Sequence, residues 1–426
     1  MPTPRSEYRY PCENCGASLQ FQPGQQELVC PYCGHSQRIG DGPARAPARQ
    51  QAGGADGEHA ILLDPSTGRA LQWDAQHKVP DLTEIPLDKG LRLDAAGADL
   101  VQQVRTLSCP NCGAKVEADP DRHATACPFC ATPVVTDTGA TRQIKPQGVL
   151  PFVVTEKQAH AALEDWLGRL WFAPSGLVAY ARRGRRMNGV YSPFWTFDAA
   201  TRSEYSGQRG DAYYETVYVT QVIDGRQQRV AQQVRRIRWS RASGRVARDF
   251  NDVLVLASTS LPRRFTDGLT PWDLSHLTPY QPAYLAGFTA EGYTIALADG
   301  HQIARQEMAG VIAMDVRRAI GGDEQRVERI ATDFSAETFK HILLPIWTAA
   351  YKYNGKSYRF VVNGQSGRVQ GERPYSVWKI ALAVILALIA ATVVLYLANE
   401  GGYVQFSPSG GLNIDLPRGD YIIRGY

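Results

Sequence analysis

Cys12-Glu-Asn-Cys15-Gly16, near the start of the chain, recurs as Cys109-Pro-Asn-Cys112-Gly113. Each copy is followed, after the same number of residues, by a second CxxC pair. These second pairs are Cys30-Pro-Tyr-Cys33 and Cys127-Pro-Phe-Cys130, so the repeat uses all eight cysteines of the chain. Two CxxC pairs about 15–20 residues apart are typical of a four-thiolate zinc site. The spacing therefore predicts two Zn²⁺ ions.

The residues around the cysteines favour metal-binding turns. Proline fixes one backbone angle of a tight turn, and the glycine that follows three of the four pairs accepts a positive φ. Two such turns aim four sulfurs at one ion and leave no open position, as in structural zinc sites. The units resemble the zinc ribbons of transcription and replication proteins. The predicted ligands are Cys12, Cys15, Cys30, Cys33, Cys109, Cys112, Cys127 and Cys130.

Other uses of the cysteines fit the sequence less well. Two disulfides per unit would need an oxidising compartment, and the first residues lack the apolar stretch of a secretory signal. A redox CxxC motif normally accompanies a βαβ unit, which is not predicted here. His35 and His123 lie outside the repeated pattern and no HExxH motif occurs, so catalytic zinc is not expected.

Residues 380–398 form an uncharged apolar run. As a helix the run would be about 28 Å long, which is close to the hydrocarbon thickness of a bilayer. Trp378 and Tyr396 lie near its ends, where aromatic side chains favour the membrane interface. A buried core helix would normally carry a polar stripe, and this run has none. The sequence predicts a single transmembrane helix.

The charges that flank this helix predict its orientation. Arg359, Arg368, Arg373 and Lys379 precede it closely, whereas only Arg418 follows it within a comparable distance. The positive-inside rule then places the long N-terminal part in the cytoplasm, at the inner membrane, where thiols stay reduced.

Composition and landmarks predict an α+β protein of several parts. The 426 residues are 44% hydrophobic and 21% charged, which is ordinary for globular domains, and the net charge of +4 is too mild to indicate nucleic-acid binding by itself. The predicted parts are a zinc ribbon at 1–40, a flexible linker at 41–57, an intermediate segment at 58–106 with a short helix near 95–105, a second zinc ribbon at 107–136, a β-rich body with helices at 143–375, a transmembrane helix at 377–398 and an exterior tail at 399–426.

Hydrophobic periodicity predicts the elements of the body. Strands are expected at 149–154, 190–205, 212–222, 228–239, 342–353 and 357–362, with hairpin turns at Asp224-Gly225 and Asn354-Gly355. Thr155 and Gln158 predict a capping box that opens a helix reaching 170, and a second helix is expected at 303–319. Strands and helices come in blocks without regular alternation, which favours α+β.

Two segments of the body share the pattern Pro-x-Trp-Thr. They are Tyr191-Ser-Pro-Phe-Trp-Thr-Phe197 and Leu343-Leu-Pro-Ile-Trp-Thr-Ala349. Two related β units in one pseudo-symmetric domain would explain the pattern, as would independent use of tryptophan in two edge strands.

Motifs for catalysis are absent from the sequence. Gly355-Lys356-Ser357 lacks the first glycine of a nucleotide-binding loop, because Ala350 stands in its place. No GxSxG elbow and no GxGxxG motif at the start of a helix occur. We therefore expect a protein that is not an enzyme.

Eight arginines lie between residues 226 and 248, a stretch without acidic residues that also contains Trp239. They form either the solvated face of a hairpin, a surface for anionic lipid or a protein, or a phosphate-binding surface for nucleic acid. The arginines are Arg226, Arg229, Arg235, Arg236, Arg238, Arg241, Arg245 and Arg248.

Taken together, these motifs resemble a family of bacterial zinc-ribbon membrane proteins. The resemblance rests on the cysteine pairs, on Pro193-Phe-Trp-Thr-Phe197, Pro345-Ile-Trp-Thr348, Tyr353-Asn-Gly-Lys-Ser-Tyr358 and Val362-Asn-Gly-Gln-Ser-Gly367, and on the terminal apolar helix. It covers most of residues 1–400, with the cysteine spacing as its sharp motif. Members are often labelled primosomal-helicase-like or TFIIB-type zinc-ribbon proteins, and the missing nucleotide loop conflicts with a helicase here.

The resemblance implies a partner as well as a location. Relatives are similar to proteins encoded beside SPFH, or flotillin-like, proteins, which they are thought to recruit to membranes. The expected function is therefore a membrane adaptor with two structural zinc ribbons. The alternative is a membrane-tethered nucleic-acid-binding protein that uses the ribbons and the arginine-rich hairpin. A hydrolase in the body would need a cleft of convergent titratable groups, which the sequence does not show.

Overall fold

The computed structural model describes the chain in segments that fall into two compact units. The described residues are 10–39, 62–63, 70–71, 82, 84–92, 101–117, 124–130, 132–135, 140–172, 187–223, 226–353, 356–372, 375–400, 404–406 and 412–414. The first unit comprises residues 1–163 and 186–371, and the second comprises 164–185 and 372–426. The linker predicted at 41–57 lies outside the described residues.

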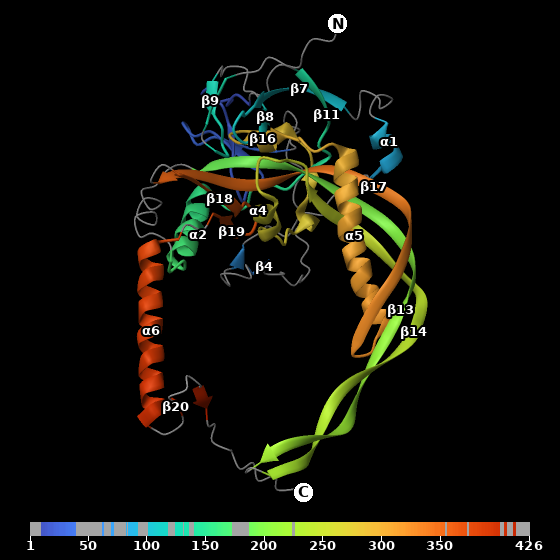
Figure 1. Ribbon diagram of the computed structural model, residues 1–426. Coiled ribbons are helices and arrows are strands. Elements are labelled where there is room, and N and C mark those ends of the chain that lie inside the picture. Colours follow the sequence, from blue (N-terminus) through green and yellow to red (C-terminus); the bar gives the residue numbers. More distant parts are fainter. Residues whose placement is uncertain are drawn as a thin grey trace, which may run out of the picture. The chain divides into compact units, whose positions relative to one another are not determined.

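Three long strands form the centre of the first unit (Figure 1). Strand β13 (Asn188–Ile223) lies between β14 (Arg226–Leu256) and β17 (Glu324–Tyr353) and is antiparallel to both. Strand β17 is antiparallel to the next strand, β18 (Lys356–Asn363), which also pairs with β19 (Val369–Gly371). Both predicted hairpins are confirmed, because Ile223 pairs with Arg226 and Tyr353 pairs with Lys356.

The predicted strands at 190–205 and 212–222 are parts of one continuous strand. Glycine within a strand often marks a bulge or a close approach of backbone rather than an end. Here the register of β13 against β17 shifts between Ser206 and Gly207. A Cβ atom at Gly207 would lie 2.2 Å from the carbonyl oxygen of Arg326, so this position requires glycine.

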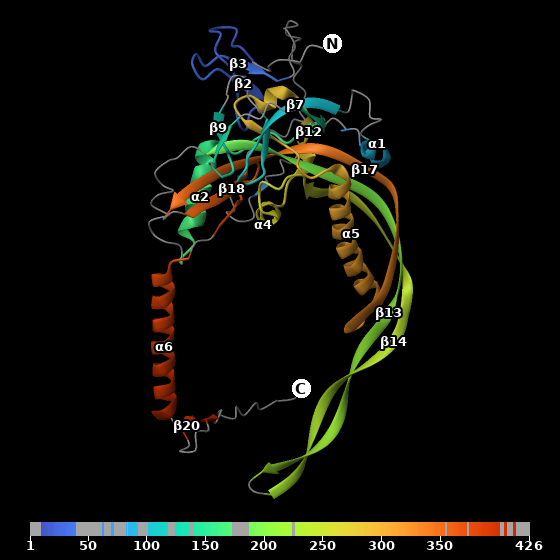
Figure 2. The same ribbon diagram turned by 45° about the horizontal axis from the view of Figure 1, so that its top comes forward.

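Helix α5 (Leu297–Ile320) lies along the long strands and includes the helix predicted at 303–319 (Figure 2). One side of the helix is buried, with residues at helical spacing: Leu297, Gly300, Ala304, Met308, Ile312, Val316 and Ile320. Helix α2 (Glu156–Gly168) opens with the predicted capping box. The backbone N–H of Thr155 donates to Gln158 Oε1 at 2.8 Å, and the N–H of Gln158 donates to Thr155 Oγ1 at 3.3 Å.

The two Pro-x-Trp-Thr segments occupy equivalent places in two halves of the body. Each half runs short strand, helix, long strand, strand: β12 (Gly148–Val149), α2, β13 and β14 in one, and β16 (Thr289–Gly292), α5, β17 and β18 in the other. The short strand of each half pairs in parallel with the long strand of the other half, β12 with β17 and β16 with β13. Each half therefore contributes its short strand to the edge of the long strand of the other half.

The two tryptophans repeat this symmetry in their contacts. Trp195 packs against Tyr293, with ring centroids 5.0 Å apart, and its indole N–H donates to the Ile295 carbonyl at 3.0 Å. Trp347 packs against Phe152, again at 5.0 Å, and donates to the Val154 carbonyl at 2.8 Å. In each case the acceptor lies two residues after the aromatic partner, which favours the pseudo-symmetric interpretation of the repeated pattern.

Two sequence predictions were wrong in detail. The helix expected near 95–105 conflicts with strand β7 (Val101–Ser108), which pairs with β8 (Lys115–Glu117) and with β11 (Ala140–Ile144). Pairing on both edges outweighs the weak helical preference of this segment. The strand expected at 149–154 ends at Val149, and the buried residues that follow are extended but irregular.

Shorter elements complete the first unit. They are β1 (Gln20–Phe21), β2 (Glu27–Val29), β3 (Ser36–Arg38), β4 (Leu62–Leu63), β5 (Ala70–Leu71), β6 (Ile85–Pro86), α1 (Leu87–Leu91), β9 (Ala124–Ala126), β10 (Pro133–Val135), α4 (Arg263–Gly268), β15 (Thr278–Pro279) and the 3-10 turns Leu274–His276 and Pro282–Leu285. The protein is thus mixed α+β and rich in strands.

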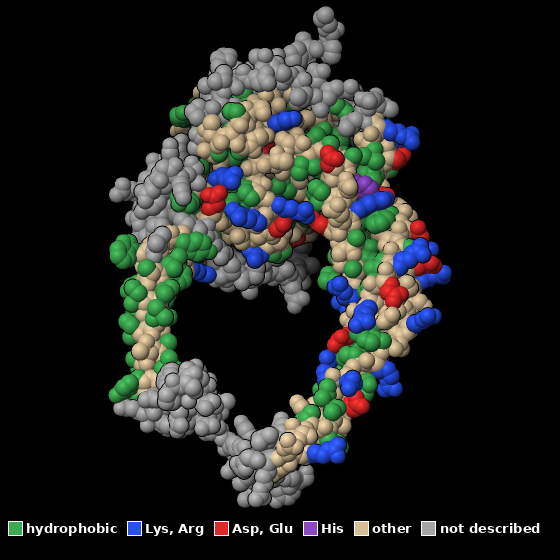
Figure 3. Space-filling model, in the orientation of Figure 1, with side chains coloured by type: hydrophobic (Ala, Val, Ile, Leu, Met, Phe, Trp, Pro, Cys, Tyr) green, Lys and Arg blue, Asp and Glu red, His purple; other side chains and the backbone are tan. Residues whose placement is uncertain are grey.

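The second unit is built around helix α6 (Val377–Glu400), followed by the small hairpin of β20 (Val404–Phe406) and β21 (Leu412–Ile414). Residues Trp378–Leu397 are long and apolar enough to cross a membrane, and none of this stretch is buried within the protein. Figure 3 shows hydrophobic side chains along the length of α6. An exposed apolar surface of this length favours contact with something other than water.

Two cysteine clusters as candidate metal centres

The structure gathers the eight cysteines into two groups of four. In each group the four sulfur atoms all lie within 4.8 Å of one another. The first cluster contains Cys12, Cys15, Cys30 and Cys33, and the second contains Cys109, Cys112, Cys127 and Cys130. These are the two groups that the repeated spacing predicted.

Distances between sulfurs fit a shared metal ion and exclude disulfides in this structure. Cys12 and Cys33 Sγ are 3.5 Å apart and Cys15 and Cys30 Sγ are 3.4 Å apart, and the corresponding pairs of the second cluster are 3.5 and 3.6 Å apart. A disulfide requires about 2.05 Å. Four sulfurs at about 2.3 Å from a tetrahedral Zn²⁺ would be roughly 3.8 Å apart. The clusters therefore have the dimensions of a four-thiolate metal site.

Backbone turns set this geometry. The N–H of Gly16 donates to the Cys12 carbonyl at 2.8 Å, and the same bond joins Gly34 to Cys30 and Gly113 to Cys109. These three glycines have φ of 73°, 73° and 74°. The positive φ that the sequence predicted for the turns is confirmed at all three positions. Ala131, at the equivalent place in the fourth turn, lies outside the described residues.

Hydrogen bonds favour the thiolate form of some cysteines. A bond from the backbone N–H of His35 is the main cause that lowers the pKa of Cys33 to about 6. A bond from Cys112 is the main cause that lowers the pKa of Cys127 to about 5, helped by the N–H groups of Phe129 and Cys130. The same bond is the main cause that raises the pKa of Cys112, so one thiol of this pair keeps a proton while the other ionises. A metal ion would displace that proton, because thiolates are the form that binds metal.

The first cluster lies at the surface, and the strand beside it contacts the body. Its strand β1 carries Phe21, whose backbone N–H donates to the Ala286 carbonyl at 2.9 Å. The Phe21 ring makes edge contacts with Tyr284 and Phe288, at centroid distances of 5.4 and 6.1 Å. Cys15 and Cys33 remain exposed. A second backbone bond joins this unit to the body, from the Gly24 N–H to the Phe152 carbonyl at 2.8 Å.

The second cluster forms part of the body's core. Cys109, Cys127 and Phe129 are buried in one hydrophobic cluster with body residues such as Leu150 and Phe194. Strand β8, between its two cysteine pairs, adds to the sheet because Val116 pairs with Glu291 of β16. The Thr348 hydroxyl donates to the Pro128 carbonyl at 2.9 Å. The residues that could hold a metal ion here are therefore also part of the packing of the sheet.

One repeated position differs sharply in solvent exposure between the clusters. Tyr32 and Phe129 each precede the last cysteine of their cluster. The Tyr32 residue is 84% exposed, whereas Phe129 is 1% exposed. This difference in exposure has no signal in the sequence, because an aromatic residue stands at this position in both copies.

A buried acid beside the second cluster was also missed. Ser258 Oγ donates to Glu291 Oε1 at 2.5 Å, while Glu291 Oε2 has no partner among the described residues. Burial raises the pKa of Glu291 to about 7. The only signal in the sequence was one acid among small and apolar residues.

The arginine-rich hairpin is exposed and partly neutralised. Four of its eight arginines form ion pairs, namely Arg235 with Glu324 (3.0 Å), Arg236 with Glu215 (2.5 Å), Arg245 with Glu204 (2.7 Å) and Arg248 with Asp315 (2.6 Å). Arg229 and Arg238 lie over the rings of Tyr218 and Tyr213. The side chain of Arg226 lies outside the described residues. This arrangement favours the solvated-face interpretation over a phosphate-binding surface.

Of the two histidines near the clusters, the structure describes His35, which is not part of either group of possible metal ligands. The His35 carbonyl accepts a hydrogen bond from the Cys30 N–H at 2.8 Å, so the backbone of His35 stabilises the turn that holds Cys30 and Cys33. His123 lies outside the described residues.

The comparisons with known proteins give one distant relative. The chain is 26% identical over 243 residues to the uncharacterized protein YdjG of Bacillus subtilis (strain 168). The alignment covers 56% of this chain and 66% of that protein. No family model and no solved structure matches the chain. Function must therefore be inferred from the residues and their geometry.

Proposed function

We propose that this chain is a single-pass membrane adaptor, without catalytic activity, that uses two structural zinc ribbons and docks a protein partner through the first of them. The observation that carries the proposal is the exposure of Tyr32. An aromatic side chain that is 84% exposed, on a small surface made rigid by a metal, is typical of an interaction site.

Zinc is the metal that fits the clusters best. Four cysteine sulfurs without a carboxylate or carbonyl ligand form a soft donor set, which selects zinc or an iron–sulfur centre. The sulfurs of each cluster all lie within 4.8 Å of one another, which suits one ion. Zn²⁺ would close each site with four thiolates and supply folding free energy rather than catalysis.

The span Trp378–Leu397 would hold the chain in the inner membrane, with the N-terminal part in the cytoplasm. Its support is the exposed apolar surface of α6 and the excess of arginine and lysine before the helix. A single tether raises the effective concentration of any partner bound at the membrane. By the family resemblance, the proposed partner is an SPFH or flotillin-like scaffold protein.

In-cell crosslinking of the full chain tests this function. Tyr32→Ala should abolish recovery of a membrane-scaffold partner while leaving the chain folded and in the membrane. Tyr214→Ala is the matched control, because Tyr214 is also exposed, at 66%, but lies on the β13–β14 hairpin. If the partner is recovered equally with Tyr32→Ala, docking through the first ribbon is wrong.

Nucleic-acid binding remains the second candidate because exposed arginines and tyrosines share the same hairpin. Figure 3 shows Lys and Arg side chains along β13–β14. Binding through phosphates would weaken steeply as salt rises and would be lost in a variant with Arg229, Arg238 and Arg241 changed to Ala. Persistence of RNA or DNA through purification, with no protein partner, would favour this candidate over the adaptor.

A further inference from the structure

Two exposed aromatic residues lie beside the start of α6, although they are distant from it in sequence. Trp171 is 81% exposed and Phe172 is 40% exposed, and they follow the end of α2. The backbone N–H of Ser376 donates to the Phe172 carbonyl at 2.7 Å. Lys379 Nζ donates to the Trp171 carbonyl at 3.1 Å. These two bonds fix the aromatic pair to the first turn of the helix.

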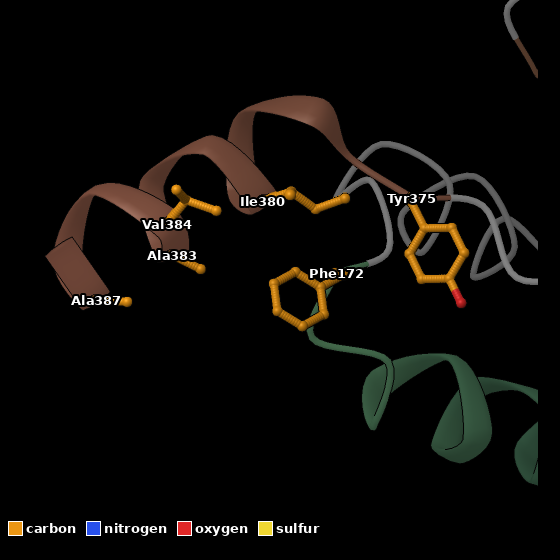
Figure 4. A pocket seen from close by; sticks show the side chains of 6 residues that line it. All are labelled: Phe172, Tyr375, Ile380, Ala383, Val384 and Ala387. Carbon is orange, nitrogen blue, oxygen red and sulfur yellow. The ribbon is translucent and has the colours of Figure 1, made fainter.

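The Phe172 ring forms an apolar groove with one side of α6. The groove has a volume of about 400 Å³ and is lined by Phe172, Tyr375, Ile380, Ala383, Val384 and Ala387. Residues 380, 383, 384 and 387 share one face of a helix. Figure 4 shows the Phe172 ring turned toward this face. The two alanines leave space beside the helix that larger side chains would fill.

The groove is continuous with the surface of the span. Ile380–Ala387 belongs to the stretch that is long and apolar enough to cross a membrane. Ala387 lies about 13 Å along the axis from Trp378, well inside a hydrocarbon layer about 30 Å thick if Trp378 marks its boundary. A lining of this kind suits a hydrocarbon chain rather than a peptide, whose backbone would find few hydrogen-bonding partners there.

Two backbone carbonyls beside the groove are hydrogen-bonded within the protein, which suits an apolar environment. Non-helical backbone at membrane depth is tolerated where its polar groups are bonded within the protein. The carbonyls of Trp171 and Phe172 both accept such bonds. Exposed tryptophans at 171 and 378 also suit the interface between lipid and water, since their rings combine an apolar body with one donor.

The geometry points to a second membrane contact in this protein: Trp171 and Phe172 insert beside α6, and the groove between Phe172 and the helix binds a phospholipid acyl chain. This inference rests on α6 crossing the membrane, as the proposed function requires. It adds a lipid-binding site formed by two segments distant in sequence. Trp171 and Phe172 are thereby held at the bilayer surface.

Photocrosslinking of the full chain in phospholipid nanodiscs tests the inference. Phe172→p-benzoylphenylalanine places a reactive group in the groove, and phosphatidylcholine with an alkyne-tagged acyl chain reports lipid adducts. Val384→p-benzoylphenylalanine is the positive control on α6, and Tyr32→p-benzoylphenylalanine is the control in the first cysteine cluster. We expect lipid adducts at 172 within about twofold of those at 384 and at least about fivefold above those at 32.

The outcomes separate this inference from the membrane span itself. Adducts at 384 but not at 172, or adducts at 172 only to protein, would overturn the lipid contact and leave the span intact. An absence of lipid adducts at both 384 and 172 would overturn the span as well. If the substitution at 172 disturbs folding, Trp171→p-benzoylphenylalanine gives the second measurement, with lipid adducts expected again and their absence counting against the inference.

Discussion

The two cysteine clusters share a sequence pattern, turn geometry and sulfur spacing, but they differ in what surrounds them. The first contacts the body through Phe21 and Gly24 and keeps Tyr32 exposed. The second buries Phe129 and adds strand β8 to the sheet. One cysteine unit thus presents a surface, while the other supports the fold. The comparison shows that the cysteine motif specifies a local site, whereas the residues around the motif determine whether that site lies at the surface or in the core.

The largest difference is expected from removal of one ligand. Cys127→Ser should lose one zinc and unfold the body, because structural zinc supplies about 10–16 kcal/mol, as much as a domain's whole stability of about 5–15 kcal/mol. Cys30→Ser, at the matched position, should lose one zinc and leave the body folded. Metal content and hydrogen exchange of β13 and β17 measure both effects. Equal loss of protection in the two variants would end the distinction between the clusters.

The paired aromatic residues should differ by several kcal/mol. Phe129→Ala removes a buried ring and should lower the free energy of unfolding of the body by about 3–5 kcal/mol. Tyr32→Ala removes an exposed ring and should change it by less than about 0.5 kcal/mol. Denaturant unfolding followed by tryptophan fluorescence gives both values. A large loss for Tyr32→Ala would mean that the first cluster also supports the core.

A pH-dependent effect is expected beside the second cluster. Burial raises the pKa of Glu291 from 4.5 to about 7, so the carboxyl holds its proton in the folded protein after the unfolded chain has released it. Stability is therefore lost as pH rises from about 4.5 through 7. Glu291→Gln cannot ionise and should raise the free energy of unfolding at pH 8 by up to roughly 3 kcal/mol, with no gain below pH 4.

The Glu291 prediction is measured as unfolding curves of both proteins across this pH range. A gain that is the same at every pH would show that packing, not ionisation, is responsible. If Glu291→Gln also changed the zinc affinity of the first cluster, the two clusters would be coupled.

The smallest effect is expected at the turn glycines. Gly113→Ala forces a Cβ into a positive φ of 74°, which costs about 1–2 kcal/mol. Space is not limiting, because the nearest atom, Thr259 Oγ1, would lie 3.6 Å from the new Cβ. This variant should destabilise the body, whereas Gly16→Ala should weaken only the first metal site. Chelator competition and thermal unfolding, measured on both, distinguish the two results.

Features that depend on residues close together in the sequence were predicted well. Cysteine spacing placed the two clusters, the Thr155–Gln158 pair placed the start of α2, and the Asp224-Gly225 turn placed the long hairpin. Each of these signals lies within a few residues of the feature it specifies. The repeated Pro-x-Trp-Thr segments also indicated two related halves, and the matched contacts of Trp195 and Trp347 agree with that interpretation.

Features that depend on distant partners were not predictable in the same way. The continuity of β13 depends on β17, and the strand at 101–108 depends on pairing with β8 and β11. The burial of Phe129 depends on body residues such as Phe194, and the Pro128 beside it is held by Thr348. Periodicity and propensity carry no information about such contacts.

The exchange of short strands between the halves has a consequence for biosynthesis. Strand β12 is made early but pairs with β17, which ends at Tyr353, so the sheet cannot close until most of the chain has left the ribosome. The apolar span begins shortly afterwards, at Trp378. The body therefore closes only shortly before the apolar span is synthesised, and until then the strands of the N-terminal half lack partners that come later in the chain.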